Sequence, residues 1–317
     1  MDEWGRPDGV PALLLHGGPG SGCSPFLRRF FDPERYRVIC PDQRGAGRST
    51  PAGSIAHNTT PHLLADLRTL RAVLGISQWL VVGGSWGATL ALAHGLDQPQ
   101  AVSGLLLRST FLARPNDIDG FFKGAPAALA EQWRGLAGLG GHQLRALTRL
   151  WTDWEHRMNG GEAPPRLLNA RELDVQIARL RVQSHYLSHG CWLQQPPLLE
   201  RCAALPRVPT LLLHGSDDRV CQPLGAQALH AEIPGSALDW VESAGHDPSH
   251  PAMVQKMVHA LDAFAAHKAF RAIESDHACR ARGSEGKYRS GRCEGATVGR
   301  KSVPDANTEA RGQQGTP

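Results

Sequence analysis

Residues 79–92 read WLVVGGSWGATLAL: an apolar run, two glycines, a serine and a second apolar run. The first run predicts a buried strand, and the second predicts a helix. In Gly83-x-Ser85-x-Gly87 a glycine lies on each side of the serine, which permits a turn tight enough to expose the hydroxyl. The pattern alone arises by chance roughly 0.2 times in such a chain, so its weight comes from the strand and helix around it. We predict a nucleophile elbow at Ser85; the alternative is an incidental serine in a glycine-rich turn.

Strand and helix patterns alternate through most of the chain. Apolar runs predict buried strands at Ala12–Leu15, Arg37–Cys40, Trp79–Val82, Gly104–Leu107, Thr210–Leu213 and Leu238–Val241. Helices are predicted at Pro61–Leu74, with Thr60 as N-cap, and at Thr89–Leu96, Leu224–Glu232 and Ala252–Ala265. This alternation predicts an α/β protein with a mostly parallel sheet flanked by helices.

Residues 111–202 interrupt the alternation. They contain no convincing strand pattern, but they hold four of the eight tryptophans, namely Trp133, Trp151, Trp154 and Trp192. We predict an inserted helical cap here, with residues 1–110 and 203–267 forming the core domain. The tryptophans either form the cap's own core or line a substrate pocket. Residues 268–317 are rich in Gly, Ser, Arg and Glu and are predicted to be a disordered tail. A frame-shifted end and a regulatory segment would explain this composition equally well.

Composition excludes several classes of protein. The net charge is +4, but residues 268–317 hold ten basic and six acidic residues, which leaves 24 of each in the rest of the chain. The basic excess therefore forms no patch for nucleic acid. No apolar run approaches the roughly 20 residues that cross a bilayer, and the start, MDEWGR, does not resemble a secretory signal. The seven cysteines show no CxxC spacing and predict reduced thiols in a cytoplasmic protein.

A serine hydroxyl needs a base that takes its proton. Among fifteen histidines, His246 follows the predicted strand Leu238–Val241 through a short loop, at a carboxyl end of the sheet. The carboxylate that orients this base should follow the preceding strand, where Asp217 and Asp218 are the candidates. We choose Asp218 because the third residue after the His-Gly turn points back toward the sheet. Serine, aspartate and histidine then have the chain order of the α/β-hydrolase triad; alternatively, both aspartates only cap the next helix.

The oxyanion of an acyl-transfer reaction needs backbone N–H donors. One donor is predicted to be the amide of Trp86, directly after the nucleophile. The other is predicted to be the amide of Gly18, in the glycine-rich loop that follows Ala12–Leu15. We interpret His16 of this loop as a structural residue rather than a catalytic one.

Four segments together resemble the proline iminopeptidases (prolyl aminopeptidases) of the α/β-hydrolase fold. The segments are His16–Gly20, Asp42–Ser49, Asn58–Thr60 and Gly83–Leu92, and the resemblance covers about residues 5–267. It implies release of an N-terminal proline from short peptides through a serine acyl-enzyme, with no metal and no cofactor. Members of this family usually begin with an additional β-hairpin, so the resemblance also implies an exposed sheet edge here.

The resemblance also implies how the substrate's free amine is held. Trp151-x-x-Trp154-Glu155 is similar to the family's cap segment and places Glu155 at the amine; an ordinary solvated helix residue is the alternative. The family's second cap glutamate lies just before a His-Tyr pair, where this chain has Gln183. An amide accepts a hydrogen bond but brings no negative charge, so the strictness of the proline preference stays open.

The sequence therefore predicts a cytoplasmic serine aminopeptidase that acts on short peptides with a free N-terminus and binds neither nucleic acid nor membrane. An esterase or amidase of the same fold, with a different acyl specificity, is the first alternative. An inactive truncated homologue is the second. The sequence does not indicate an oligomeric state.

Overall fold

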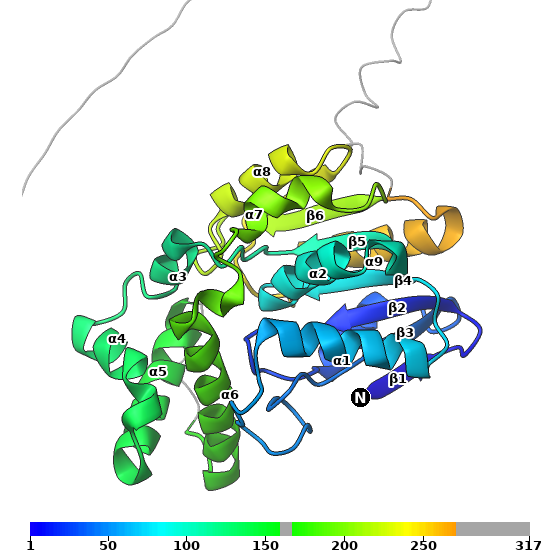
Figure 1. Cartoon of the computed structure of the whole chain (residues 1–317). Coiled ribbons are helices and arrows are strands. Elements are labelled where there is room, and N and C mark those ends of the chain that lie inside the picture. The colour runs from blue at the N-terminus through cyan, green and yellow to red at the C-terminus, as the bar shows by residue number, and fades with distance from the viewer. Residues whose placement is uncertain (159–166, 271–317) are drawn as a thin grey trace, which may run out of the picture. The chain divides into compact units, whose positions relative to one another are not determined.

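A computed structural model describes residues 1–158 and 167–270 of the chain. The described residues form a seven-stranded sheet in the order β1-β3-β2-β4-β5-β6-β7 (Figure 1). The strands are β1 (Asp2–Gly5), β2 (Val10–Leu15), β3 (Tyr36–Cys40), β4 (Trp79–Gly84), β5 (Val102–Arg108), β6 (Thr210–Gly215) and β7 (Ala237–Val241). β1 pairs antiparallel with β3, and the other neighbours are parallel. The six strands predicted from apolar runs are all confirmed.

Helices cover both faces of the sheet, as the alternation predicted. The helices of the core are α1 (Thr60–Val73), α2 (Trp86–Asp97), α8 (Pro223–Glu232) and α9 (Pro251–His267). Alternate side chains of one strand point to opposite faces, and β2 shows this clearly. Leu13 and Leu15 pack with α1, α2 and α8 on one face, whereas Leu14 packs with α9 on the other (Figure 1).

Two details of the core differ from the prediction. The edge strand β1 was missed because four residues with alternating burial give only a weak apolar signal. The N-cap of α1 is Thr59, not Thr60. Thr60 is already helical, and its hydroxyl donates a hydrogen bond to the carbonyl oxygen of Cys191 at 2.6 Å. The predicted N-cap was therefore wrong by one residue.

Between β5 and β6 the chain forms α3 (Pro115–Phe121), α4 (Ala127–Arg134), α5 (Gly141–Met158), α6 (Ala170–Ser188) and α7 (Leu198–Arg201). Trp133 and Trp151 are buried with their ring centroids 5.3 Å apart and form the centre of this helical segment. Trp154 packs on Trp151 but also borders a cavity. Trp192 stacks on His189. Trp133 and Trp151 therefore form the core of the helical segment, as one interpretation predicted, whereas Trp154 also lines a cavity, as the other did.

Cys23 and Cys40 form a disulfide that joins the loop after β2 to the end of β3. The expectation of reduced thiols is wrong for this pair. Cys191, Cys202 and Cys221 are buried free cysteines. The predicted disordered tail falls almost entirely on residues 271–317, which lie outside the described residues.

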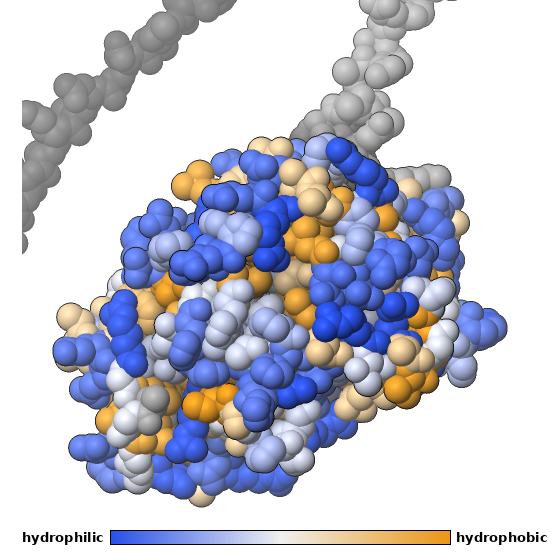
Figure 2. Space-filling model, viewed as in Figure 1, coloured by the Kyte–Doolittle hydropathy of each residue, from blue (hydrophilic) through white to orange (hydrophobic). Residues whose placement is uncertain are grey.

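Polar side chains dominate the face of the molecule in Figure 2, with hydrophobic residues in small groups between them. The most exposed large hydrophobic residues of the described part include Val73 in α1, Leu167 in the loop before α6 and Leu224 in α8. None of the helices described here combines the length and the apolar character needed to span a membrane.

Candidate active site

Ser85 lies at the sharp turn between β4 and α2. Its backbone has φ 57° and ψ −126°, a conformation that L-residues rarely adopt and that often marks functional sites. Glycine is required on both sides of it. A Cβ on Gly83 would lie 2.2 Å from the carbonyl oxygen of Gly87, and a Cβ on Gly87 would lie 2.1 Å from that of Leu15. The glycines therefore let the turn close while the serine side chain projects from it.

Asp218 and His246 meet at the carboxyl ends of β6 and β7. His246 Nδ1 lies 2.9 Å from Asp218 Oδ2, and Asp218 Oδ1 accepts hydrogen bonds from the amides of Val220 and Cys221. Asp218 is 3% exposed, whereas Asp217 is exposed and its Oδ1 accepts a hydrogen bond from Ser216 Oγ at 3.1 Å. Burial alone would raise the pKa of Asp218, but the charge and hydrogen bond of His246 and the Cys221 amide lower it to about 2. The carboxylate is therefore ionised at neutral pH and holds the imidazole in one orientation.

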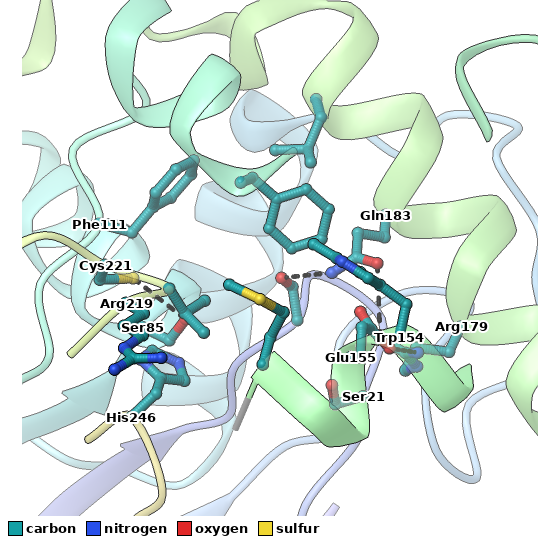
Figure 3. A pocket seen from close by; sticks show the side chains of 15 residues that line it. Ser21, Ser85, Phe111, Trp154, Glu155, Arg179, Gln183, Arg219, Cys221 and His246 are labelled. Atoms are coloured by element: carbon teal, nitrogen blue, oxygen red, sulfur yellow. Dashed lines mark hydrogen bonds and ion pairs between the residues drawn. The ribbon is translucent and has the colours of Figure 1, made fainter. Parts of the chain in front are cut away.

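Ser85 and His246 line the same cavity of about 220 Å³ and lie together on one side of it (Figure 3). Ser85 Oγ lies 3.9 Å from Cys221 Sγ. The hydrogen bonds of the described residues do not include one between Ser85 and His246. Catalytic hydrogen bonds are often long or poorly aligned without substrate, and tighten when it binds. The structure thus brings the three residues of the predicted triad to one site.

Arg108 is a residue of this site that the sequence analysis missed. It ends β5, is buried, and donates a hydrogen bond from Nη1 to the carbonyl oxygen of His246 at 2.8 Å. Burial lowers the pKa of this guanidinium, and the nearby Asp218 charge opposes that effect. An arginine directly after the apolar run Leu105–Leu107 was the signal available in the sequence. Its hydrogen bond holds the backbone of the loop that carries the base.

The glycine-rich loop after β2 passes beside the nucleophile. A Cβ built on Gly17 would lie 3.5 Å from the Cβ of Ser85, and the next residue, Gly18, lines the same cavity as Ser85. Trp86 is the first residue of α2, where amides have no partner within the helix. Both predicted oxyanion donors are therefore near Ser85, and the positive end of the α2 dipole adds to the field there.

Gln43 joins the glycine-rich loop after β2 to the start of α2. Its side-chain nitrogen donates to the carbonyl oxygen of His16 at 3.0 Å, and its side-chain oxygen accepts from Trp86 Nε1 at 2.8 Å. The backbone amide of Gln43 donates to His16 Nε2 at 3.0 Å. His16 is buried and bonded within the loop, as its structural interpretation expected. Gln43 belongs to the segment Asp42–Ser49, and its role in joining these two parts was not predicted.

The cap provides the opposite side of the cavity. Glu155 on α5 and Gln183 on α6 both line it, together with Arg179 of α6, which was not predicted (Figure 3). Arg179 forms an ion pair with Glu155, and it donates from Nη1 to Gln183 Oε1 at 3.4 Å. The alternative of Glu155 as an ordinary solvated residue does not fit this place in the structure.

Much of the remaining cavity lining is apolar, with Phe111, Phe121, Trp154, Met158 and Leu187 among its residues. This lining fits a small apolar acyl group next to the nucleophile. Among residues 1–158 and 167–270, no cluster of His, Cys, Asp or Glu has the arrangement of a metal site.

Comparison with known proteins adds to this geometry. The model of a protein family described as "alpha/beta hydrolase fold" matches residues 11–251. A proline iminopeptidase of Arabidopsis thaliana is 37% identical over 283 residues, which cover 81% of this chain and 74% of the relative. A proline iminopeptidase of Neisseria meningitidis is 37% identical, and the match covers 84% of this chain and 92% of the relative. One of Xylella fastidiosa is 34% identical, and the match covers 83% of this chain and 91% of the relative.

Solved structures show the same architecture at lower sequence identity. An α/β hydrolase from a deep-sea metagenome library superposes with a TM-score of 0.61 at 16% identity, covering 86% of this chain and 95% of its own. A thermophilic esterase from Thermogutta terrifontis has a TM-score of 0.61 at 22% identity, covering 84% and 92%. At these identities the likeness concerns the fold alone.

Proposed function

The chain belongs to the proline iminopeptidase family of α/β-hydrolase-fold enzymes, and we propose that it is a serine aminopeptidase that releases N-terminal proline from short peptides. The α/β-hydrolase fold expected from the sequence is confirmed. The observation that carries the proposal is that Ser85 and the Asp218–His246 pair share one cavity with a carboxylate of the cap.

In the proposed reaction, the Ser85 hydroxyl attacks the carbonyl carbon of the N-terminal residue while His246 takes the hydroxyl proton. Asp218 accepts a hydrogen bond from Nδ1–H of His246, so that Nε2 is unprotonated and ready to act as the base. The amides of Gly18 and Trp86 stabilise the oxyanion. His246 then gives its proton to the leaving amine, and an acyl-enzyme on Ser85 remains. Water, activated by the same histidine, hydrolyses this ester.

Glu155 gives the proposed reaction its exopeptidase character. Its carboxylate lies across the cavity from Ser85 (Figure 3), where it can bind the protonated amine of an N-terminal residue. An internal peptide bond has no such amine and cannot make this charged hydrogen bond. Gln183 adds a neutral acceptor on the same side of the cavity.

The experiment that tests this function measures hydrolysis of proline anilide, N-acetylproline anilide and other amino-acid anilides by the purified protein. We expect proline anilide to be cleaved fastest and Ser85→Ala to abolish cleavage. Faster cleavage of N-acetylproline anilide than of proline anilide would exclude the aminopeptidase. Cleavage of no substrate at all would also exclude it. A fluorophosphonate probe that labels the wild type but not Ser85→Ala would exclude an inactive homologue.

A second candidate is an esterase or amidase that uses the cavity for a different acyl group. The ion pair between Arg179 and Glu155, with an amide at residue 183, favours it because both features reduce the negative charge available to an amine. Preference for a nitrophenyl ester over every amino-acid anilide would select this candidate.

We also propose a cytoplasmic location, on the basis of the three buried cysteines with free thiols. The disulfide between Cys23 and Cys40 is the feature typical of oxidising compartments. Cell fractionation, with alkylation of free thiols before lysis, tests the location. Recovery of the protein outside the cytoplasmic fraction would exclude this location.

A further inference from the structure

A cation of the chain itself lies at the proposed amine site. Arg179 donates from Nη1 to Glu155 Oε1 at 3.2 Å and from Nη2 to Glu155 Oε2, so that the guanidinium faces both carboxylate oxygens. Its Nε donates to Gln176 Oε1 at 2.8 Å, which fixes the plane of the group. The two side chains are only 15% and 18% exposed. A two-point ion pair shielded from water in this way is among the stronger polar contacts in proteins.

Gln183 completes the same arrangement. It is 3% exposed. Its Oε1 accepts from Arg179 at 3.4 Å, while its Nε2 donates to the carbonyl oxygen of Gly18 at 3.1 Å. The acceptor of this amide is therefore turned toward the guanidinium, and its donor is turned toward the oxyanion loop. A substrate amine would have to share with Arg179 the oxygens of both Glu155 and Gln183.

The charges of the side chains that line the cavity also oppose the binding of an amine at Glu155. Among its described lining residues, Glu155 contributes one negative charge, while Arg179 and Arg219 contribute two positive charges. A protonated amine brought to Glu155 meets a guanidinium already bound there, and like charges at contact distance repel each other. A substrate whose nitrogen is acylated carries no charge and does not meet this repulsion.

We propose that Arg179 is a specificity-determining residue, which competes with the substrate's protonated amine for Glu155 and thereby weakens the preference of the enzyme for a free N-terminus over an acylated one. The inference rests on the proposed function, because it takes Glu155 as the group that binds the amine. Arg179 acts on the binding of substrate and takes no part in the chemistry at Ser85.

The test compares kcat/KM for proline anilide and N-acetylproline anilide in the wild type and three variants. In Arg179→Gln, we expect the ratio of free to acetylated substrate to rise at least tenfold, mainly through a lower KM for proline anilide. Arg179→Lys keeps the positive charge and should keep the ratio within threefold of the wild type. Arg181→Gln is the matched control, since Arg181 lies on the same helix but is exposed and does not line the cavity. A ratio in Arg179→Gln within threefold of the wild type, or below it, would overturn the inference.

A binding measurement separates this inference from the proposed function, because it needs no turnover. In the Ser85→Ala background, calorimetry should show that Arg179→Gln tightens prolinamide binding at least tenfold and leaves N-acetylprolinamide binding within threefold. Unchanged prolinamide binding in a variant that unfolds at the wild-type temperature overturns the role of Arg179 even if proline anilide is hydrolysed. Absent hydrolysis by the wild type overturns the proposed function, whatever the binding shows.

Discussion

Asp218 illustrates how one buried side chain sets the state of another. Its Oδ1 is held by two backbone amides, so Oδ2 is fixed toward His246 Nδ1. Because its pKa is lowered to about 2, the carboxylate stays charged at neutral pH, where the proposed reaction requires His246 to accept and return a proton. The role proposed for Asp218 is therefore to fix the tautomer of the base and to stabilise its charged form.

We predict that Asp218→Asn lowers kcat about 10³- to 10⁴-fold, because an amide nitrogen at this position stabilises the wrong tautomer of His246. Steady-state kinetics with proline anilide measures the effect. Asp217→Asn is the control, since Asp217 is exposed and lies outside the pair with His246; it should change kcat less than twofold. A loss of less than tenfold in Asp218→Asn would remove Asp218 from the triad.

The strand β4, the turn at Ser85 and the helix α2 are packed tightly against each other. Ten consecutive residues of α2, from Trp86 to Gly95, are buried, and its buried His94 accepts a hydrogen bond at Nε2 from Trp79 Nε1 of β4 at 3.0 Å. This contact ties the far end of the helix to the start of the strand. The position of Ser85 therefore depends on packing along the whole of α2.

Protonation of His94 should destabilise this element. Burial lowers the pKa of His94 from 6.5 to about 4 in the folded protein. Between these values the unfolded chain binds a proton at His94 that the folded chain does not, so the free energy of unfolding falls as the pH falls from about 6.5 to 4. The contribution of His94 over that range is on the order of 3 kcal/mol. Above pH 6.5 the residue is neutral in both states and contributes no pH dependence.

Urea denaturation at a series of pH values checks this prediction. In this pH range the unfolded wild type binds more protons than the folded wild type. We expect this difference to be smaller by close to one proton in His94→Gln. His259→Gln provides the comparison, because His259 is exposed on α9. Equal pH dependence in the wild type and His94→Gln would contradict the assignment.

The helices between β5 and β6 are joined to the rest of the fold around Asn58. The buried side chain of Asn58 donates to the carbonyl oxygens of Arg44 and Ser54, both at 2.8 Å, and accepts from the hydroxyl of Tyr186 at 2.9 Å. Tyr186 lies on α6, the helix that also carries Arg179 and Gln183. Movement of this junction would therefore shift the residues that face Ser85 across the cavity.

We predict that Asn58→Ala lowers the free energy of unfolding by roughly 2–4 kcal/mol, because it leaves several buried polar groups without their partner. Tyr186→Phe, which removes one of these hydrogen bonds, should cost about 1 kcal/mol. Asn116→Ala, at an exposed position of α3, should stay within about 0.5 kcal/mol of the wild type. Thermal and urea unfolding measure all three, and an Asn58→Ala protein as stable as Asn116→Ala would show that the junction contributes little.

The sequence by itself determined the parallel core and predicted that Ser85, Asp218 and His246 meet at one site. Apolar runs closed by turn residues predict strands locally, and in a parallel sheet the carboxyl ends of strands share one edge. The residues that follow β4, β6 and β7 are therefore neighbours in space although they are far apart in sequence. The same local signals are weak for a four-residue strand, and β1 was missed for that reason.

Only the tertiary structure decided what surrounds these residues. Arg108 holds the loop of His246 from 138 positions away, and Arg179 reaches Glu155 across 24 positions on a different helix. Neither pair has a fixed spacing, because each depends on how separate elements pack. The same is true of the pairing of Cys23 with Cys40, which the loop between β2 and β3 brings together. Contacts between elements are set by packing in three dimensions, whereas strands, turns and their order are set by neighbours along the chain.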